Sequence, residues 1–189
     1  MLYTSTQNNK ESVSSAQAIA QGISRDGGLF VPESFPKYDG ITFEALLSLD
    51  YRERAKKILS DYLTDFTEEE IADCVDKAYT AEKFGSDNPA PIASVYHKNA
   101  ELNLLELWHG PTCAFKDMAL QILPHLLTKS LKKTADGKKA VILVATSGDT
   151  GKAALEGFKD VENTSIIVFY PSDGVSPMQK HQMNTTTGN

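Results

Sequence analysis

The stretch from residue 140 to residue 170 restricts the fold more than any other part of the sequence. Ala140 to Ala145 is a continuous apolar run of strand length, and Ser165 to Tyr170 is a second one. Between them, Lys152 to Phe158 has the apolar spacing of a helix. Buried strands joined by a crossover helix are typical of parallel sheets. The sequence therefore predicts an α/β fold with an open parallel sheet, followed by another helix over Ser176 to Met183.

The turn Ser147-Gly148-Asp149-Thr150-Gly151 lies where the first of these strands ends and the helix begins. Such a junction offers unpaired backbone N–H groups and the positive end of a helix dipole, which suit an anion. The glycines at 148 and 151 let a ligand approach the backbone closely. A glycine-rich turn that binds nothing is the alternative interpretation.

Two nucleotide-binding motifs do not fit this turn. A Walker phosphate loop needs Gly at its first position and Ser or Thr after Gly-Lys, where this chain has Thr146 and Ala153. The turn also lacks the Gly-x-Gly-x-x-Gly spacing of a dinucleotide fold. These mismatches argue against an NTPase and against an NAD-binding protein.

Lys116 is the strongest candidate for a reactive side chain. It follows Ala114 and Phe115 and precedes Asp117, where a long apolar run opens, so we expect it at a loop-to-helix junction. Partial desolvation beside apolar neighbours favours a neutral amine, which attacks a carbonyl to form a Schiff base. The alternative is a lysine whose stem lies on apolar surface while its ammonium reaches water. Cys113 lies three residues earlier and has no identified activating base.

Residues 1–88 are predicted to form a mostly helical domain. Helical spacing of apolar residues runs through 12–22, with Gly22 as its end, and through most of 42–80. Thr67 and Glu70 have the spacing of a capping box. Between these helical regions, paired glycines predict a tight turn before a short buried strand, Leu29 to Val31, that stops at Pro32.

Two apolar stripes on the predicted helices are expected to pack in the core. Each stripe recurs at three- and four-residue spacing, as buried helix faces do. Their members are Ala55, Ile58, Leu59, Tyr62 and Leu63 in one, and Ile71, Cys74, Val75, Ala78 and Tyr79 in the other.

Residues 89–189 are predicted to begin a second domain, after a turn-rich linker at 85–91. Strands are expected over 92–96 and 102–108, with a hairpin connection at 99–101. A buried helix should follow over 118–131, kinked at Pro124, and then a polar loop over 134–139. Because two parallel strands alone leave an unfinished edge, we expect this chain to be the N-terminal fragment of a longer protein.

Composition limits the possible partners. The 189 residues carry a net charge of −6 and no broad cationic stretch, so nucleic acid is an unexpected partner. The N-terminus lacks a cationic leader followed by an apolar core, and no segment suggests a membrane span, so a cytoplasmic protein is expected. Two cysteines make neither a disulfide framework nor a zinc site, and no metal site is expected.

The chain resembles the threonine synthase family in several stretches that occur in family order. They are Asp26-Gly27-Gly28-Leu29-Phe30-Val31-Pro32, the stretch His109 to Thr112 with Ala114 to Asp117, the stretch Ala145 to Gly151, and Tyr170-Pro171 through Ser176-Pro177 to Gln179. The resemblance implies a fold-type II enzyme similar to the tryptophan synthase β-subunit. It also implies that pyridoxal 5'-phosphate is bound as a covalent aldimine on Lys116.

The same resemblance implies roles for individual residues. Phe115 and Asp149 would contact the cofactor, with Asp149 near its phenolic oxygen, while Ser147, Gly148 and Thr150 would hold the substrate carboxylate. An aspartate at 149 is typical of threonine synthases, whereas many relatives of the same fold have asparagine. A carboxylate facing an oxyanion repels it unless one proton is shared.

The reaction implied is the conversion of O-phospho-L-homoserine and water to L-threonine and phosphate. The family's Gly-Asn-Phe-Gly loop for the cofactor phosphate has no match in this chain, so we expect the fragment alone to bind the cofactor weakly and to be inactive. Two alternatives remain open at this point. One is a threonine-synthase-like phospho-lyase acting on a related phosphorylated amino alcohol, and the other is a truncated module without catalytic activity. The sequence leaves the oligomeric state unknown.

Overall fold

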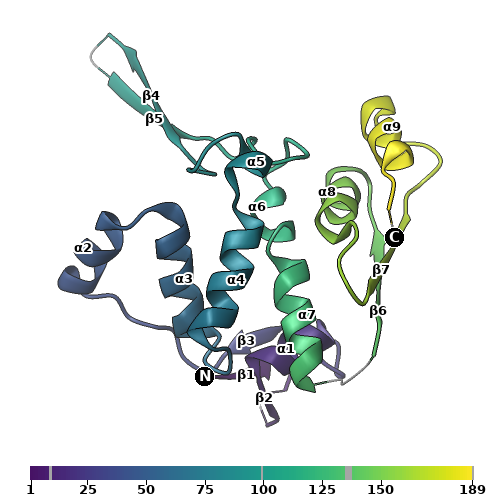
Figure 1. The fold of residues 1–189 in the computed structure, drawn as a ribbon, viewed down its shortest axis with the longest axis horizontal. Helices are drawn as coiled ribbons and strands as arrows, with labels where there is room; N and C mark the ends of the chain where they lie inside the picture. Colours follow the sequence, from purple (N-terminus) through teal and green to yellow (C-terminus); the bar gives the residue numbers. More distant parts are fainter. Residues whose placement is uncertain (9, 99, 135–137, 189) are drawn as a thin grey trace. The chain divides into compact units, whose positions relative to one another are not determined.

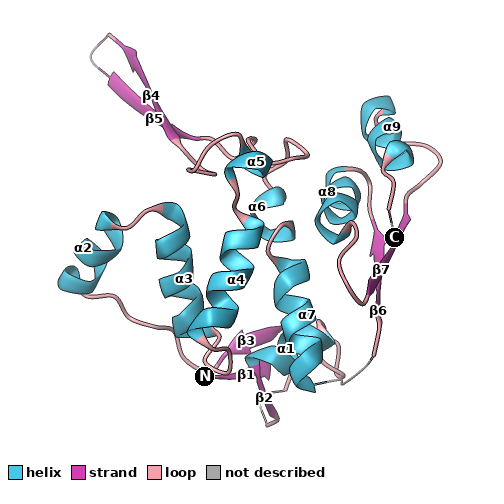
Figure 2. Ribbon diagram, in the orientation of Figure 1, coloured by secondary structure: helices cyan, strands magenta, loops and turns pink. Residues whose placement is uncertain are grey.

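A computed structural model describes residues 1–8, 10–98, 100–134 and 138–188, and these divide into two compact units. The first comprises the described residues of Met1–Lys77 and His125–Lys138, and the second those of Ala78–Pro124 and Lys139–Asn189. Figure 1 labels the elements along the chain, and Figure 2 separates helices from strands. The domain boundary at 88/89 stays a prediction. Within the described ranges, no helix is long and apolar enough to cross a membrane.

The first unit contains a small antiparallel sheet that the sequence did not predict. Its strands are β1 (Leu2–Ser5), β2 (Ser12–Ser14) and β3 (Phe30–Pro32), in the order β2-β1-β3. Tyr3 pairs with Val13 on one side and with Pro32 on the other. The helix expected over 12–22 is therefore wrong at its start, because residues 12–14 pair with β1. Helix α1 (Ser15–Gln21) begins after Ser14, which forms a capping box with Gln17, and it ends at Gly22 as predicted.

The prediction of a buried strand over residues 29–31 is also wrong in part. A strand is present, but it includes Pro32, and Leu29 and Val31 are 63% and 37% exposed. β3 lies at the edge of the sheet and pairs with β1 alone, so a proline without a backbone N–H is tolerated there. One face of an edge strand in an antiparallel sheet also stays open to solvent.

The predicted helical region of the first unit is confirmed as three helices, α2 (Gly40–Ser48), α3 (Tyr51–Tyr62) and α4 (Glu68–Ala78). The capping box at the start of α4 is present, because Glu70 accepts from the Thr67 amide at 2.9 Å and donates its own amide to Thr67 Oγ1 at 3.1 Å. The stripe of α4 is buried as predicted, and Cys74 and Val75 are completely enclosed. The α3 stripe is only half-buried within the helix, and Leu63 just beyond it is buried.

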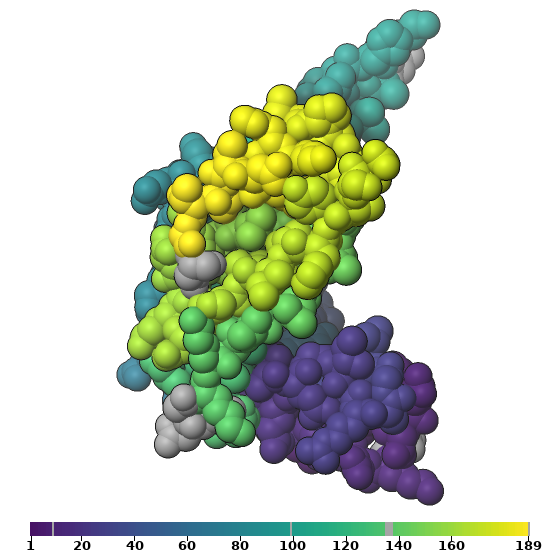
Figure 3. All heavy atoms as spheres, turned by 90° about the vertical axis from the view of Figure 1, so that its right-hand side faces the viewer, coloured from purple at the N-terminus to yellow at the C-terminus, as the bar shows by residue number. Residues whose placement is uncertain are grey.

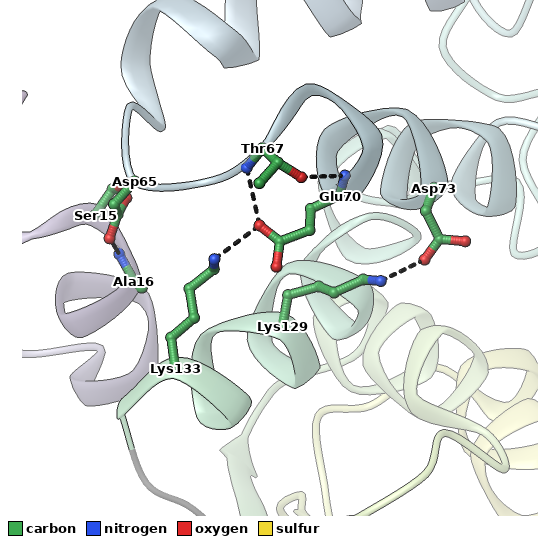
Figure 4. A network of polar contacts seen from close by, with 8 residues as sticks. All are labelled: Ser15, Ala16, Asp65, Thr67, Glu70, Asp73, Lys129 and Lys133. Atoms are coloured by element: carbon green, nitrogen blue, oxygen red, sulfur yellow. Dashed lines mark hydrogen bonds and ion pairs between the residues drawn. The ribbon is translucent and has the colours of Figure 1, made fainter.

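Helix α7 (Leu123–Thr134) is joined to α4 by charged side chains (Figure 4). Lys129 lies 2.8 Å from Asp73, and Lys133 lies 2.8 Å from Glu70. The Lys133 ammonium also lies 5.4 Å from the centre of the Phe66 ring. These pairs fix the rotation of the His125–Thr134 part of α7 against the buried stripe of α4.

A single kinked helix over 118–131 is not what forms. The chain makes α6 (Asp117–Leu120), turns at residues 121–122, and begins α7 with Pro124 in its first turn. Proline lacks an N–H and clashes with the carbonyl four residues earlier, so the Leu120 carbonyl is freed and the helix breaks. In the second unit, this carbonyl lies so close to Gly157 that an added Cβ there would be 2.1 Å from its oxygen.

An antiparallel hairpin, β4 (Ile92–His97) and β5 (Ala100–Leu105), belongs to the second unit and follows the short helix α5 (Ala81–Phe84). It extends away from the rest of its unit (Figure 1, Figure 3), and most of its side chains are exposed. The strand expected over 102–108 is wrong in its bounds. It starts at Ala100 and ends at Leu105, which pairs with Ile92. The residue before Ile92 is Pro91, which accepts from the Glu106 amide but has no N–H to continue the ladder. Residue 99 of the predicted turn, like residues 135–137 of the predicted polar loop, lies outside the described residues.

The parallel unit is confirmed. Strands β6 (Ala140–Ala145) and β7 (Thr164–Phe169) pair in parallel from Ala140↔Thr164 to Ala145↔Phe169. Helix α8 (Asp149–Phe158) connects them and packs on β7, and α9 (Pro177–Thr185) packs on α8. Figure 3 shows the yellow C-terminal segment against the yellow-green atoms that precede it. Ala153, Phe158 and Met183 are buried between these elements.

Candidate functional site

Lys116 lies at the loop-to-helix junction expected from the sequence. It is the residue just before α6, and its side chain is half-buried. Its Nζ atom lies 4.3 Å from the centre of the Phe115 ring, which is itself 60% exposed. The aromatic face therefore covers one side of the amine while the other side stays accessible. Among the described ion pairs of the chain, none includes Lys116.

The loop before Lys116 is held by a buried carboxylate that sequence reasoning missed. Asp117 is completely buried, and it accepts from the Thr112 amide and from the Thr112 hydroxyl, both at 2.8 Å. Gly110 packs so tightly on this group that an added Cβ would lie 2.4 Å from the Asp117 Cβ. Because Asp117 adjoins Lys116, the closed loop fixes the backbone from which the lysine projects. The only signal in the sequence is a threonine and an aspartate five positions apart, on either side of Cys113-Ala114-Phe115-Lys116.

A contact between a histidine and a carboxylate lies at the start of the same segment. His109 Nε2 lies 2.6 Å from Glu106 Oε2, and the His109 ring stacks on Trp108 with centroids 5.7 Å apart. Cys113 is exposed and has a positive φ of 56°.

The turn that carries the predicted substrate contacts is folded around Thr146. Its hydroxyl accepts from the amides of Gly148, at 3.0 Å, and Gly151, at 3.2 Å. An added Cβ on Gly151 would lie 2.4 Å from the Thr146 methyl group. An added Cβ on Gly148 would lie 2.5 Å from the Gln179 side chain. Atoms of the protein itself therefore lie against both glycines on the side where a Cβ would be. Close approach of a ligand to their backbone stays a prediction.

The remaining predicted residues lie at the first turn of α8. Ser147 and Asp149 are exposed, and Thr150 is half-buried. Asp149 opens the helix and accepts a hydrogen bond from Gln179 Nε2. The structure thus gathers Ser147, Gly148, Asp149 and Thr150 in one turn and adds Gln179 to them, while α6, which begins beside Lys116, packs on α8. The roles of these residues stay predictions.

Other features of the described residues do not compete with this site. Two hollows of about 620 and 600 Å³ lie in the first unit, and no predicted site residue lines either of them. The first is mainly apolar and is edged by Lys57 and Asp61. A hollow without convergent reactive groups identifies no reaction, so the candidate site stays the one predicted around Lys116 and Asp149. Within the described ranges, no group of three or more His, Cys, Asp and Glu could hold a metal ion.

Comparisons with known proteins agree with these motifs. Residues 2–79 match the family described as threonine synthase N terminus. The chain is 36% identical over its whole length to a threonine synthase from Pseudomonas aeruginosa, of which it covers 39%. It is 37% identical to threonine synthase-like 1 from Mus musculus, over 89% of this chain and 23% of that protein.

The fold matches a solved structure at similar identity. The crystal structure of PLP-bound threonine synthase from Brucella melitensis superposes with a TM-score of 0.85 at 35% identity, over 97% of this chain and 38% of that chain. The chain therefore spans about two fifths of the length of the threonine synthases that it matches.

Proposed function

Since the chain belongs to the threonine synthase family, we propose that the full-length protein converts O-phospho-L-homoserine and water to L-threonine and phosphate with pyridoxal 5'-phosphate. The observation that carries this proposal is the placement of Lys116. Its amine is half-buried on the Phe115 ring, and its backbone is held by the buried Asp117. A cofactor lysine needs a held backbone and a reachable amine, and both features support this role for Lys116.

The residues present fit the proposed cofactor. Lys116 would hold it covalently, Phe115 would cover one side of the attachment point, and Asp149 would face its phenolic oxygen. When bound, the cofactor supplies an electron sink for carbanions formed on the substrate. Substrate binding and proton transfer would be carried out by side chains and backbone groups of the protein.

Substrate binding is proposed for the turn before α8. Ser147 and Thr150 have hydroxyl groups that can donate to a carboxylate. Gly148 caps the N-terminus of α8, a helix of ten residues. The N-terminus of such a helix favours an anion, so it suits the amino-acid carboxylate. Lys116 would then move protons at the α and β carbons. Phosphate leaves from the γ carbon, and the oxygen of water adds at the β carbon, so one water is consumed for each phosphate released.

The test is a lysine substitution in the full-length protein. Lys116→Ala should abolish borohydride trapping of pyridoxal phosphate on the peptide that contains residue 116. Phosphate release from O-phospho-L-homoserine should fall by about 10³-fold or more, since the variant loses both the attachment point and the proton-transfer group. Lys159→Ala, which changes an exposed lysine just after α8, should keep both properties. Full synthase activity in the Lys116→Ala variant would overturn the proposal.

A second candidate is a phospho-lyase that acts on a related phosphorylated amino alcohol. The chain is also 37% identical to threonine synthase-like 1, a relative that carries a different name from the synthases, so a second reaction is tested beside threonine synthesis. Parallel assays of the full-length protein with O-phospho-L-homoserine and with phosphoethanolamine-type substrates separate the two reactions. Threonine as the main product supports the synthase, whereas turnover of the amino alcohol alone supports the lyase.

We also propose a cytoplasmic location, because the substrate and the cofactor are small phosphorylated molecules dissolved in water. Cell fractionation tests this directly, and recovery of the protein in the membrane fraction would contradict it.

A further inference from the structure

Gln179 connects two segments of the second unit at the candidate site. It lies in the first turn of α9, and its side chain reaches a residue thirty positions earlier in the sequence. There its Nε2 atom donates a hydrogen bond to Oδ1 of Asp149. The proposed function gives Asp149 a task at the phenolic oxygen of the cofactor and gives Gln179 none.

The orientation of the Gln179 amide is fixed from both sides. Ser176 donates its hydroxyl proton to Gln179 Oε1 at 3.1 Å, and the same hydroxyl oxygen accepts the Gln179 backbone N–H at 3.2 Å. The carboxylate of Asp149 needs a donor, so the NH₂ group is the end that faces it, and this leaves Oε1 to accept from the Ser176 hydroxyl. An added Cβ on Gly148 would lie 2.5 Å from Oε1 and 2.8 Å from Nε2, so the amide lies directly on the backbone of the turn.

An amide NH₂ only donates, and this restricts Asp149. The oxygen that meets Gln179 has to be an acceptor, so it carries no proton toward that side. A proton that Asp149 shares with a second oxyanion is therefore best placed on Oδ2, which leaves Oδ1 a full acceptor for Gln179. Two oxyanions at contact distance repel each other unless one proton lies between them.

We propose that Gln179 is a positioning residue for Asp149. By holding Oδ1 of Asp149, Gln179 turns Oδ2 toward the phenolic oxygen of the cofactor, and the shared proton lies between Oδ2 and that oxygen. Ser176 holds Gln179, Gln179 holds Asp149, and Asp149 faces the ring. This inference rests on the proposed function, because it needs pyridoxal phosphate at the site. It goes further in giving a task to a residue on α9, outside both the lysine loop and the turn before α8.

The test uses the full-length protein loaded with pyridoxal phosphate and follows the cofactor's visible absorption against pH. Gln179→Glu keeps the shape of the side chain but replaces the donor with a second acceptor, and Gln179→Met removes the donor without adding charge. The matched control is Gln182→Glu, the same change of charge nearly one turn later on α9.

The expected result is a changed titration without a loss of folding. Gln179→Glu should move the midpoint of the absorption change upward by about one pH unit, because a second carboxylate favours retention of the shared proton. Gln179→Met should move the same midpoint upward by a smaller amount, because it removes the donor to Asp149 without adding a charge. In both variants kcat should fall by about tenfold, KM should change less, and the melting temperature should stay within a few degrees. Gln182→Glu should match the wild type.

Two outcomes overturn the inference, and they are distinguishable. If both Gln179 variants titrate like the wild type while binding the cofactor, Gln179 does not position Asp149 and the proposed function is untouched. If the wild-type full-length protein binds no pyridoxal phosphate, the proposed function fails and this inference fails with it. A variant that does not fold is replaced by the other, since either one removes the amide donor.

Discussion

Thr112 donates two hydrogen bonds to Asp117, one from its backbone and one from its hydroxyl, and closes the loop that ends at Lys116. The carboxylate that accepts them is completely buried. A buried acceptor of this kind costs free energy when its partners are lost, so the loop has one favoured conformation. The backbone position of Lys116 is thus set by a contact in which the lysine itself takes no part.

Removing the hydroxyl half of this contact should loosen the loop. Thr112→Val keeps the shape of the side chain and the backbone donor, but leaves Asp117 Oδ1 without its partner, at a cost of about 1–3 kcal/mol. Hydrogen–deuterium exchange of the peptide around residues 110–120 should accelerate relative to the wild type. Thr112→Ser, which retains the hydroxyl, is the control and should exchange more slowly than the valine variant. Equal exchange in both variants would show that the hydrogen bond from the Thr112 hydroxyl to Asp117 does not hold the loop.

Gly157 offers a test of the contact between α6 and α8. Replacing glycine by alanine inside a helix ordinarily stabilises a protein by about 0.5–1 kcal/mol. Here the added Cβ would lie 2.1 Å from the Leu120 carbonyl oxygen, and overpacking of this kind costs about 1–3 kcal/mol. The clash outweighs the helix preference, so we expect Gly157→Ala to lower the urea midpoint. Gly40→Ala, in α2 with no atom within 4 Å of the new Cβ, should leave the midpoint unchanged or raise it.

The sequence was most informative where structure is set by local patterns. The apolar run of β6 is predicted to the residue and that of β7 is displaced by one, because strand length and apolar composition are visible in the sequence itself. The predicted burial is wrong in part, since Val141 and Leu143 of β6 are 56% and 66% exposed. The same holds for the capping box of α4. By contrast, residues 12–14 had helical spacing and formed a strand, since their pairing with β1 depends on hydrogen bonds to a distant segment.

The candidate site divides in the same way. Lys116 and Asp149 both lie at junctions where a loop runs into a helix, and such junctions can be predicted from the local sequence. The partners of these residues do not follow from it, because the contact between Gln179 and Asp149 spans thirty positions and depends on how α9 packs on α8. The protein atoms that lie against the glycines at 148 and 151 are equally invisible in the sequence, because Gln179 and Met183 come from a later helix.

The two cysteines should differ sharply in reactivity. Cys74 is completely buried, and this burial raises the pKa of its thiol to about 11. At pH 8 only about one molecule in a thousand would carry the reactive thiolate there. Cys113 is exposed. We expect N-ethylmaleimide at pH 8 to label the peptide containing Cys113 within minutes and to label Cys74 only after unfolding in urea. Peptide mass spectrometry reads both sites, and native labelling of Cys74 at the rate of Cys113 would contradict the burial.

The charged cluster between α4 and α7 should make stability depend on pH in the acid range. Asp73 lies 2.8 Å from Lys129 and 2.6 Å from Lys77, and hydrogen bonds from these two ammonium groups lower the pKa of its carboxyl group to about 2. A carboxyl pKa that is lower in the folded protein stabilises the fold above the unfolded pKa, near 4, and this contribution is lost as the pH falls toward 2.

The Asp73 side chain is one third exposed, so solvent and salt reduce the effect to less than about 1 kcal/mol. Asp73→Asn should therefore lower the free energy of unfolding at pH 6 by that amount, and the difference from the wild type should vanish near pH 2. Urea titrations at several pH values measure it, and 1 M NaCl should shrink the gap at pH 6. Asp76→Asn, which removes a carboxylate of the same helix that pairs with Lys56, corrects for the general change of charge. A gap for Asp73→Asn that stays constant from pH 6 to pH 2 would show that the carboxylate does not stabilise the fold through these lysines.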